Sequence, residues 1–282
     1  METIIEMFNY TFMIRALIVG ILVSLCSSLL GGPLVLKKYS MIGDGLSHVG
    51  FGALAIATAM NAAPMKVAIP VVVLAAIVLL RVSENSKLKG DAAIAVISTG
   101  ALAVGVVIMS LGNGSNIDIY NYMFGSILAL SSSDVLISVI LSVIVIIMYV
   151  FFYVKIFAVT FDESFSKATG IKTGIYNTLM AILTALTIVL GMRLMGSLLI
   201  SALIIFPALS SMRVFRSFKG TVISSGILSV VCFFTGLVIS FIYSTPPGAS
   251  VVCVNIVGFL IYMIVGKSKA VIFRMQKNRF RR

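Results

Sequence analysis

The sequence predicts an all-α integral membrane protein, a polytopic bundle of about nine transmembrane helices. Among its 282 residues, 60% are hydrophobic and only 11% are charged, and the mean hydropathy is +1.16. A soluble domain carries about 25% charged residues. The apolar residues also gather in long runs, and the basic residues fall in alternate gaps between them. Together these features predict membrane spans of about 20 residues each.

Nine apolar runs predict the spans, and no soluble domain is inserted between them, so residues 1–282 form a single transmembrane domain. Gly31-Gly32-Pro33 is expected to kink or end the first helix, and Pro207 to break the seventh locally. The second and third runs are short, and the count falls to eight if one short segment is re-entrant. The runs cover residues 10–36, 42–60, 65–81, 92–111, 133–157, 174–191, 195–212, 220–243 and 249–266.

The charges between the runs predict the orientation. Lys37 and Lys38 follow the first run, and similar basic groups follow the other odd-numbered runs, ending in the basic tail 267–282. The gaps after even-numbered runs carry few basic residues. Because cytoplasmic loops are enriched in Lys and Arg, the N-terminus is predicted outside and the C-terminal tail in the cytoplasm. The formal net charge of +12 then reflects topology, and nucleic acid is not an expected partner.

The second run opens with Gly43-Asp44-Gly45-Leu46-Ser47-His48, which contains the only histidine of the chain. A spacing of four residues puts Asp44 and His48 on one helix face, one turn apart. Ionisable residues in a span are costly and mark functional sites. A carboxylate and an imidazole suit zinc, manganese or iron(II). Asp44 and His48 are therefore the predicted metal site.

Residues 161–172 form a polar segment between spans on the predicted inner side. Asp162 and Glu163 would start a short helix, where acidic groups favour the helix dipole, and Gly170 would end it. Phe161 and Phe165, four residues apart, would share a face. The pattern predicts a short amphipathic helix along the membrane surface. It either docks into a soluble partner or is a surface helix without one.

Four ordered motifs resemble the permeases of the zinc/manganese/iron-chelate (ABC-3) family of ATP-binding-cassette importers, over nearly the whole chain except the basic tail. The first is Gly43-Asp44-x-x-Ser47-His48. The others are Phe124-Gly125-Ser126-Ile127-Leu128, Asp162-Glu163…Ala168-Thr169-Gly170, and Gly196-Ser197-Leu198-Leu199-Ile200…Ile205-Phe206-Pro207-Ala208.

The resemblance implies a permease of a bacterial cell membrane that acts as a homodimer, is driven by two copies of a separate cytoplasmic ATPase and receives metal from an extracytoplasmic binding protein. Residues 161–172 would be the coupling helix that meets the ATPase, through Asp162, Glu163, Phe165 and Gly170. Asp44 and His48 would contact the transported metal, with no permanently bound cofactor and no catalysis in this chain. The context Ser47-His48-Val49-Gly50-Phe51 favours zinc, with manganese or iron as the alternative.

Two other classes fit less well. A zinc protease needs His-Glu-x-x-His, but His48 precedes Val49 and no second histidine exists. A Gly-x-Gly-Asp protease needs glycine where Met41 stands. A stand-alone secondary transporter often carries inverted repeats, and none is evident.

Polar residues on the predicted outer side carry weaker expectations. Asp118, Asn121 and Asp134 are interpreted as solvated loop residues, with metal relay as the alternative. Arg193 pairs either with a partner protein or with Asp118; the sequence does not decide between these.

Overall fold

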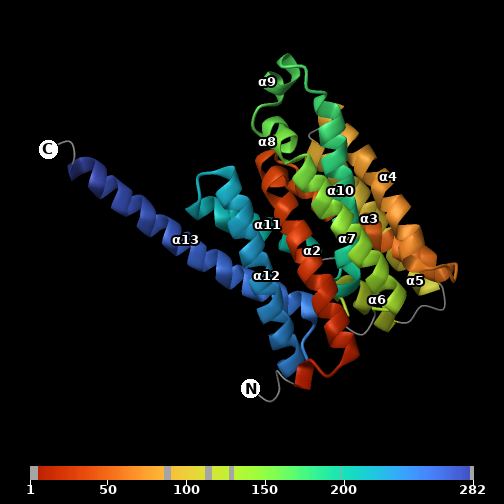
Figure 1. Cartoon of the computed structure of the whole chain (residues 1–282). Helices are drawn as coiled ribbons and strands as arrows, with labels where there is room; N and C mark the ends of the chain where they lie inside the picture. The colour runs from red at the N-terminus through yellow and green to blue at the C-terminus, as the bar shows by residue number, and fades with distance from the viewer. Residues whose placement is uncertain (1–5, 86–89, 112–115, 127–129, 198, 280–282) are drawn as a thin grey trace.

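The computed structural model describes residues 6–85, 90–111, 116–126, 130–197 and 199–279, and this part of the chain consists of helices joined by short turns and loops, without a strand (Figure 1). The helices are α2 (Thr11–Leu36), α3 (Ser40–Ala59), α4 (Pro64–Asn85), α5 (Gly90–Leu111), α6 (Asn116–Phe124), α7 (Ser132–Phe151), α8 (Tyr153–Phe161), α9 (Glu163–Ala168), α10 (Thr173–Met195), α11 (Ile200–Val214), α12 (Phe218–Tyr243) and α13 (Pro247–Arg279).

Helices α2 and α10 form the centre of the bundle. About 61% of the α2 span and 72% of the α10 span lie inside the protein. Helix α2 packs against α7, α11 and α12, and α10 packs against α4 and α3. Helix α3 lies between α4 and α5, while α13 packs on α11 and α12 and then projects from the bundle (Figure 1). The two central helices thus join an α3–α4–α5 side to an α11–α12–α13 side.

Within the described ranges, seven helices are long and apolar enough to cross a membrane: α2, α4, α5, α7, α10, α12 and α13. The chain is therefore a multi-pass membrane protein. The two other predicted spans coincide with α3, which carries Asp44 and His48, and with α11, which has only 15 residues. The count of nine spans and the orientation stay predictions.

Three local predictions differ from the structure. The run 133–157 is divided at Phe152, where α7 ends and α8 begins. Pro33 lies within α2 and Pro207 within α11, and neither proline ends its helix, while a kink at Pro33 stays a prediction. Neighbouring helices and small backbone adjustments allow proline inside membrane helices. The basic tail continues α13 as far as Arg279, and residues 280–282 lie outside the described ranges.

The order of the helices along the chain shows which helix ends lie together at each end of the bundle. Helix α2 ends and α3 and α10 begin at the end that carries α9 (Figure 1). Helix α12 begins there too, because the Phe218 ring centroid lies 5.1 Å from that of Phe157 in α8. The turn between α12 and α13, around Ser244, lies at the opposite end. The charge pattern predicts that the α9 end faces the cytoplasm.

Thiol labelling tests this orientation. In a Cys253→Ser background, which removes the exposed cysteine, Ser244→Cys is expected to react with a membrane-impermeant reagent added outside intact cells. Lys172→Cys, at the exposed start of α10, should react only after the membrane is opened. The opposite labelling pattern would refute the predicted orientation.

Candidate metal site and coupling helix

Asp44 and His48 lie one turn apart on α3, as the sequence predicted. The Oδ2 atom of Asp44 is 3.7 Å from Nε2 of His48, and the side chains are 39% and 14% exposed. The hydroxyl of Ser201, in the first turn of α11, donates to Oδ1 of Asp44 at 3.3 Å. Sequence reasoning missed Ser201, although it lies inside the last motif of the family resemblance.

Glycine residues fix the direction in which this pair points. A Cβ atom at Gly45 would lie 2.8 Å from the Ile94 side chain of α5, and one at Gly52 would lie 2.8 Å from the Ala101 carbonyl of the same helix. A Cβ at Gly50 would lie 2.4 Å from Met192 of α10. Small residues allow this close helix packing in lipid. The packed faces leave Asp44 and His48 on the remaining, partly exposed side of α3.

The donor set in one chain is small. No group of three His, Cys, Asp or Glu side chains gathers within the described residues. Zinc in closed structural sites takes four ligands, whereas this pair offers one carboxylate, one imidazole and the nearby Ser201 hydroxyl. Such a set would hold a divalent cation only with further ligands from water or another molecule. This suits a site that passes an ion on, since a pathway site must release it.

The four predicted coupling residues have distinct places around α9, which spans six residues. Asp162 is the N-cap, and its Oδ1 accepts from the Phe165 backbone N–H at 2.8 Å. The Phe165 side chain points outward and is 64% exposed. Gly170 ends the segment with a φ of +84°, a left-handed conformation that favours glycine.

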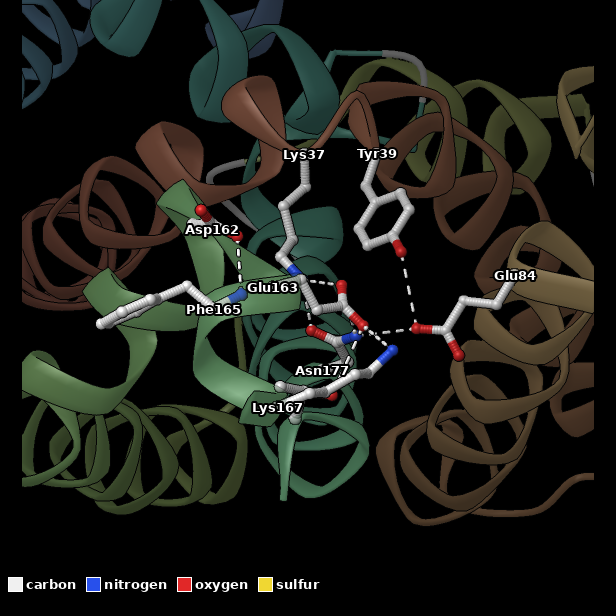
Figure 2. Close-up of polar contacts among 9 residues, drawn as sticks. Lys37, Tyr39, Glu84, Asp162, Glu163, Phe165, Lys167 and Asn177 are labelled. Atoms are coloured by element: carbon white, nitrogen blue, oxygen red, sulfur yellow. Dashed lines mark hydrogen bonds and ion pairs between the residues drawn. The ribbon is translucent and has the colours of Figure 1, made fainter. Parts of the chain in front are cut away.

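Glu163 points into a cluster of polar side chains that come from the end of α2, from α4 and from α10 (Figure 2). Its Oε2 accepts from Lys37 Nζ at 3.0 Å, and its Oε1 pairs with Lys167 at 2.9 Å. Lys37 also donates to Oδ1 of Asn177 in α10. The Asn177 amide in turn donates to Glu84 at the end of α4, with 2.8 Å between Nδ2 and Oε1. The sequence had predicted Glu163 on the surface segment but not these partners.

The charges of this cluster shift two pKa values. Burial raises the pKa of Glu163, but hydrogen bonds from Lys167 and Lys37 outweigh it and lower the pKa to about 2. Burial, together with the nearby charges of Glu84 and Glu163, raises the pKa of Tyr39 to about 12. Glu163 is therefore ionised and Tyr39 neutral at physiological pH. The stability that the ionised Glu163 carboxylate contributes is fully present above its ordinary pKa of about 4.5 and declines as the pH falls toward 2, where the carboxylate is protonated in the folded protein.

Two of the family motifs meet at the opposite end of α10. A Cβ at Gly196 would lie 2.2 Å from the Met123 carbonyl oxygen, and one at Gly125 would lie 2.3 Å from that of Leu194. The backbone N–H of Ser197 donates to the Tyr122 carbonyl at 3.0 Å. This junction places the start of α11, and so Ser201, beside α3. The motif residues Ile127, Leu128 and Leu198 lie outside the described ranges.

One outer residue differs from its interpretation as a solvated loop side chain. Asp134 lies in the first turn of α7, is 12% exposed at its side chain, and pairs with Arg193 at 3.3 Å. Ser131 caps the same turn and donates to Asp134. Asp134 is thus an acidic neighbour of Arg193 that sequence reasoning did not name. The side chain of Asp118 lies outside the described residues.

Known proteins resemble this chain over nearly its whole length. The model of the ABC 3 transport family matches residues 9–266. The high-affinity zinc uptake system membrane protein ZnuB of Haemophilus influenzae is 29% identical over 86% of this chain and 93% of that protein. The manganese transport system membrane protein MntC of Halalkalibacterium halodurans is 26% identical over 95% of this chain and 92% of that protein.

A solved structure agrees in fold. The structure of PsaBC from Streptococcus pneumoniae in complex with Fab superimposes with a TM-score of 0.84 and 28% sequence identity, over 93% of this chain and 94% of the other.

The helical bundle and its long apolar helices define a multi-pass protein of the cell membrane. The chain belongs to the ABC 3 transport family, whose model covers nearly all of it. The resemblance read from the four motifs is confirmed at this level.

The contact between Gly125 and Gly196 predicts a stability effect. Gly196→Ala should lower the melting temperature in detergent, because φ +84° and ψ 155° belong to a region that is essentially restricted to glycine and costs other residues about 1–3 kcal/mol. Gly100→Ala is the control, because a Cβ there meets nothing within 4 Å and alanine favours a helix. Equal melting temperatures for Gly196→Ala and the wild type would contradict the proposed role of this junction.

Proposed function

We propose that this protein is the membrane-spanning permease of an ATP-driven importer of a divalent transition metal, with zinc as the preferred cargo. The observation that carries the proposal is the pair of Asp44 and His48 on the open face of α3, in a chain of the ABC 3 transport family. Manganese or iron is the alternative cargo within the same function.

The preference for zinc rests on the sequence context Ser47-His48-Val49-Gly50-Phe51, and the donor chemistry of the pair is compatible with it. Imidazole suits zinc, iron, copper and nickel, whereas carboxylate and water suit manganese. His48 is the only histidine of the chain, so Nε2 and the Asp44 carboxylate form one mixed N/O set. One relative is named for zinc and another for manganese, and the names alone do not choose between the two metals.

A second copy of the chain would complete the site. Asp44 is 39% exposed at its side chain, and the exposed side chain of Met41 lies one turn before it on the same helix. A homodimer that covers this face would bring a second Asp44 and His48 toward the first pair. Four protein donors would then surround the ion during its passage.

The proposed partners contact opposite ends of the bundle. A cytoplasmic ATPase would dock on α9, where the exposed Phe165 ring provides an apolar anchor of the kind that dominates interfaces. An extracytoplasmic metal-binding protein would deliver the ion at the other end. ATP hydrolysis belongs to the separate ATPase, because the chain carries no Gly-x-x-x-x-Gly-Lys phosphate loop.

Substitution of the metal pair tests this function. Asp44→Asn and His48→Ala should each lower cellular metal accumulation by about tenfold or more, because changes around a metal ligand cost 10–100-fold. Elemental analysis of cells that depend on this permease for zinc measures the effect. Ile56→Ala is the matched control, since it truncates an exposed side chain of the same helix that has no donor atom. Wild-type accumulation by both site variants, at equal membrane abundance, would rule out the proposed site.

A further inference from the structure

We propose that Lys37 is a positioning residue that transmits the movement of α9 to the metal-site helix α3. This inference rests on the proposed function, in which α9 receives movement from an ATPase. The observation is the ion pair between Lys37 and Glu163, 126 residues apart in the chain, at the turn that leads from α2 into α3.

Helix α9 has few attachments to the bundle. It packs chiefly against its chain neighbours α8 and α10. A groove of about 940 Å³ lies beside it. Its lining comes from the end of α4 (Leu80, Arg81, Glu84), from Lys167 of α9, and from the segment 170–175 with the first turns of α10. The groove is open space on the side of α9 that carries Lys167. The Glu163 carboxylate is therefore the polar group that joins α9 to the end of α2.

Lys37 is buried and bonded to two partners where α9 meets the end of α2. Its side chain is 6% exposed, and it bonds both Glu163 and Asn177. Loss of Glu163 would leave the buried Lys37 ammonium without its charged partner, which is unfavourable. When α9 moves, the least costly response is for Lys37 to follow Glu163. Movement of α9 is thus passed to the end of α2.

The turn after Lys37 is short and well bonded. The N–H of Tyr39, the N-cap of α3, donates to the Leu34 carbonyl at 2.8 Å, and its hydroxyl lies 3.5 Å from Oε1 of Glu84. The same Glu84 oxygen accepts from Asn177. Lys37 and Tyr39 therefore tie both sides of this turn to one cluster (Figure 2).

Asp44 follows Tyr39 by five residues, a rise of about 7.5 Å along α3. A shift of the turn moves Asp44 relative to Ser201, because Ser201 lies on a different helix, α11. The hydrogen bond between Asp44 and Ser201 is the contact that such a shift would break. Displacement of α9 thus changes the position of Asp44 relative to Ser201, although among the described residues α9 does not itself contact the metal site.

The test compares metal transported per ATP hydrolysed by the permease and its ATPase in vesicles, with zinc as the cargo. Lys37→Met removes the charge at similar length and should lower this ratio about fivefold or more, the lower range of allosteric coupling. ATPase co-purification should stay at the wild-type level. Lys38→Met is the matched control, because Lys38 is the exposed neighbour in the same turn and should leave the ratio unchanged.

Two further variants separate transmission from folding and docking. Lys37→Met/Glu163→Gln removes both charges of the pair, so neither group is left without the other, and it should lose no more coupling than Lys37→Met alone. Phe165→Ala should instead reduce co-purification of the ATPase. A wild-type ratio in Lys37→Met, while the wild-type protein imports zinc, would overturn the role of Lys37 and leave the proposed function intact. Absence of ATP-dependent import by the wild type would overturn both.

Discussion

An ion pair between Lys37, at the end of α2, and Glu163 of α9 determines how the helices meet at one end of the bundle. Lys37 ends α2 with a nearly inaccessible ammonium group, and an ion in such a place needs partners. Glu163 of α9 and Asn177 of α10 supply them, and Glu84 of α4 bonds Asn177 in turn. Four helices therefore meet at one cluster, which also fixes where α3 begins.

From that starting point, packing sets the direction of the metal pair. Glycines at positions 45 and 52 bring α3 against α5, and Gly50 brings it against α10. Larger residues at these positions would rotate or displace the helix. Asp44 and His48 consequently occupy the face that these contacts leave open, with Ser201 of α11 as their polar neighbour. A single chain thus presents too few donors to complete the proposed metal site within the described residues, which fits the proposal of transient binding.

Sequence patterns predicted the structural features that depend on residues close together in the chain. The apolar runs correspond to helices, and the spacing of Asp44 and His48 placed them together because helical periodicity is local. Long-range polar pairing was not predictable in this way. Glu163 was assigned to a surface segment, whereas its carboxylate turns inward to Lys37. Asp134 was interpreted as solvated, yet it pairs with Arg193. The interruption at Phe152 has no proline or glycine to mark it, and no periodicity predicted it.

The most direct measurement of the central claim is zinc uptake into vesicles that contain this permease, the ATPase that co-purifies with it and an extracytoplasmic metal-binding protein. A metal ATP-binding-cassette permease should accumulate zinc only when ATP is supplied on the ATPase side and the binding protein is present on the other. Zinc accumulation without the ATPase, driven by a proton or sodium gradient, would contradict the claim and identify a secondary transporter instead.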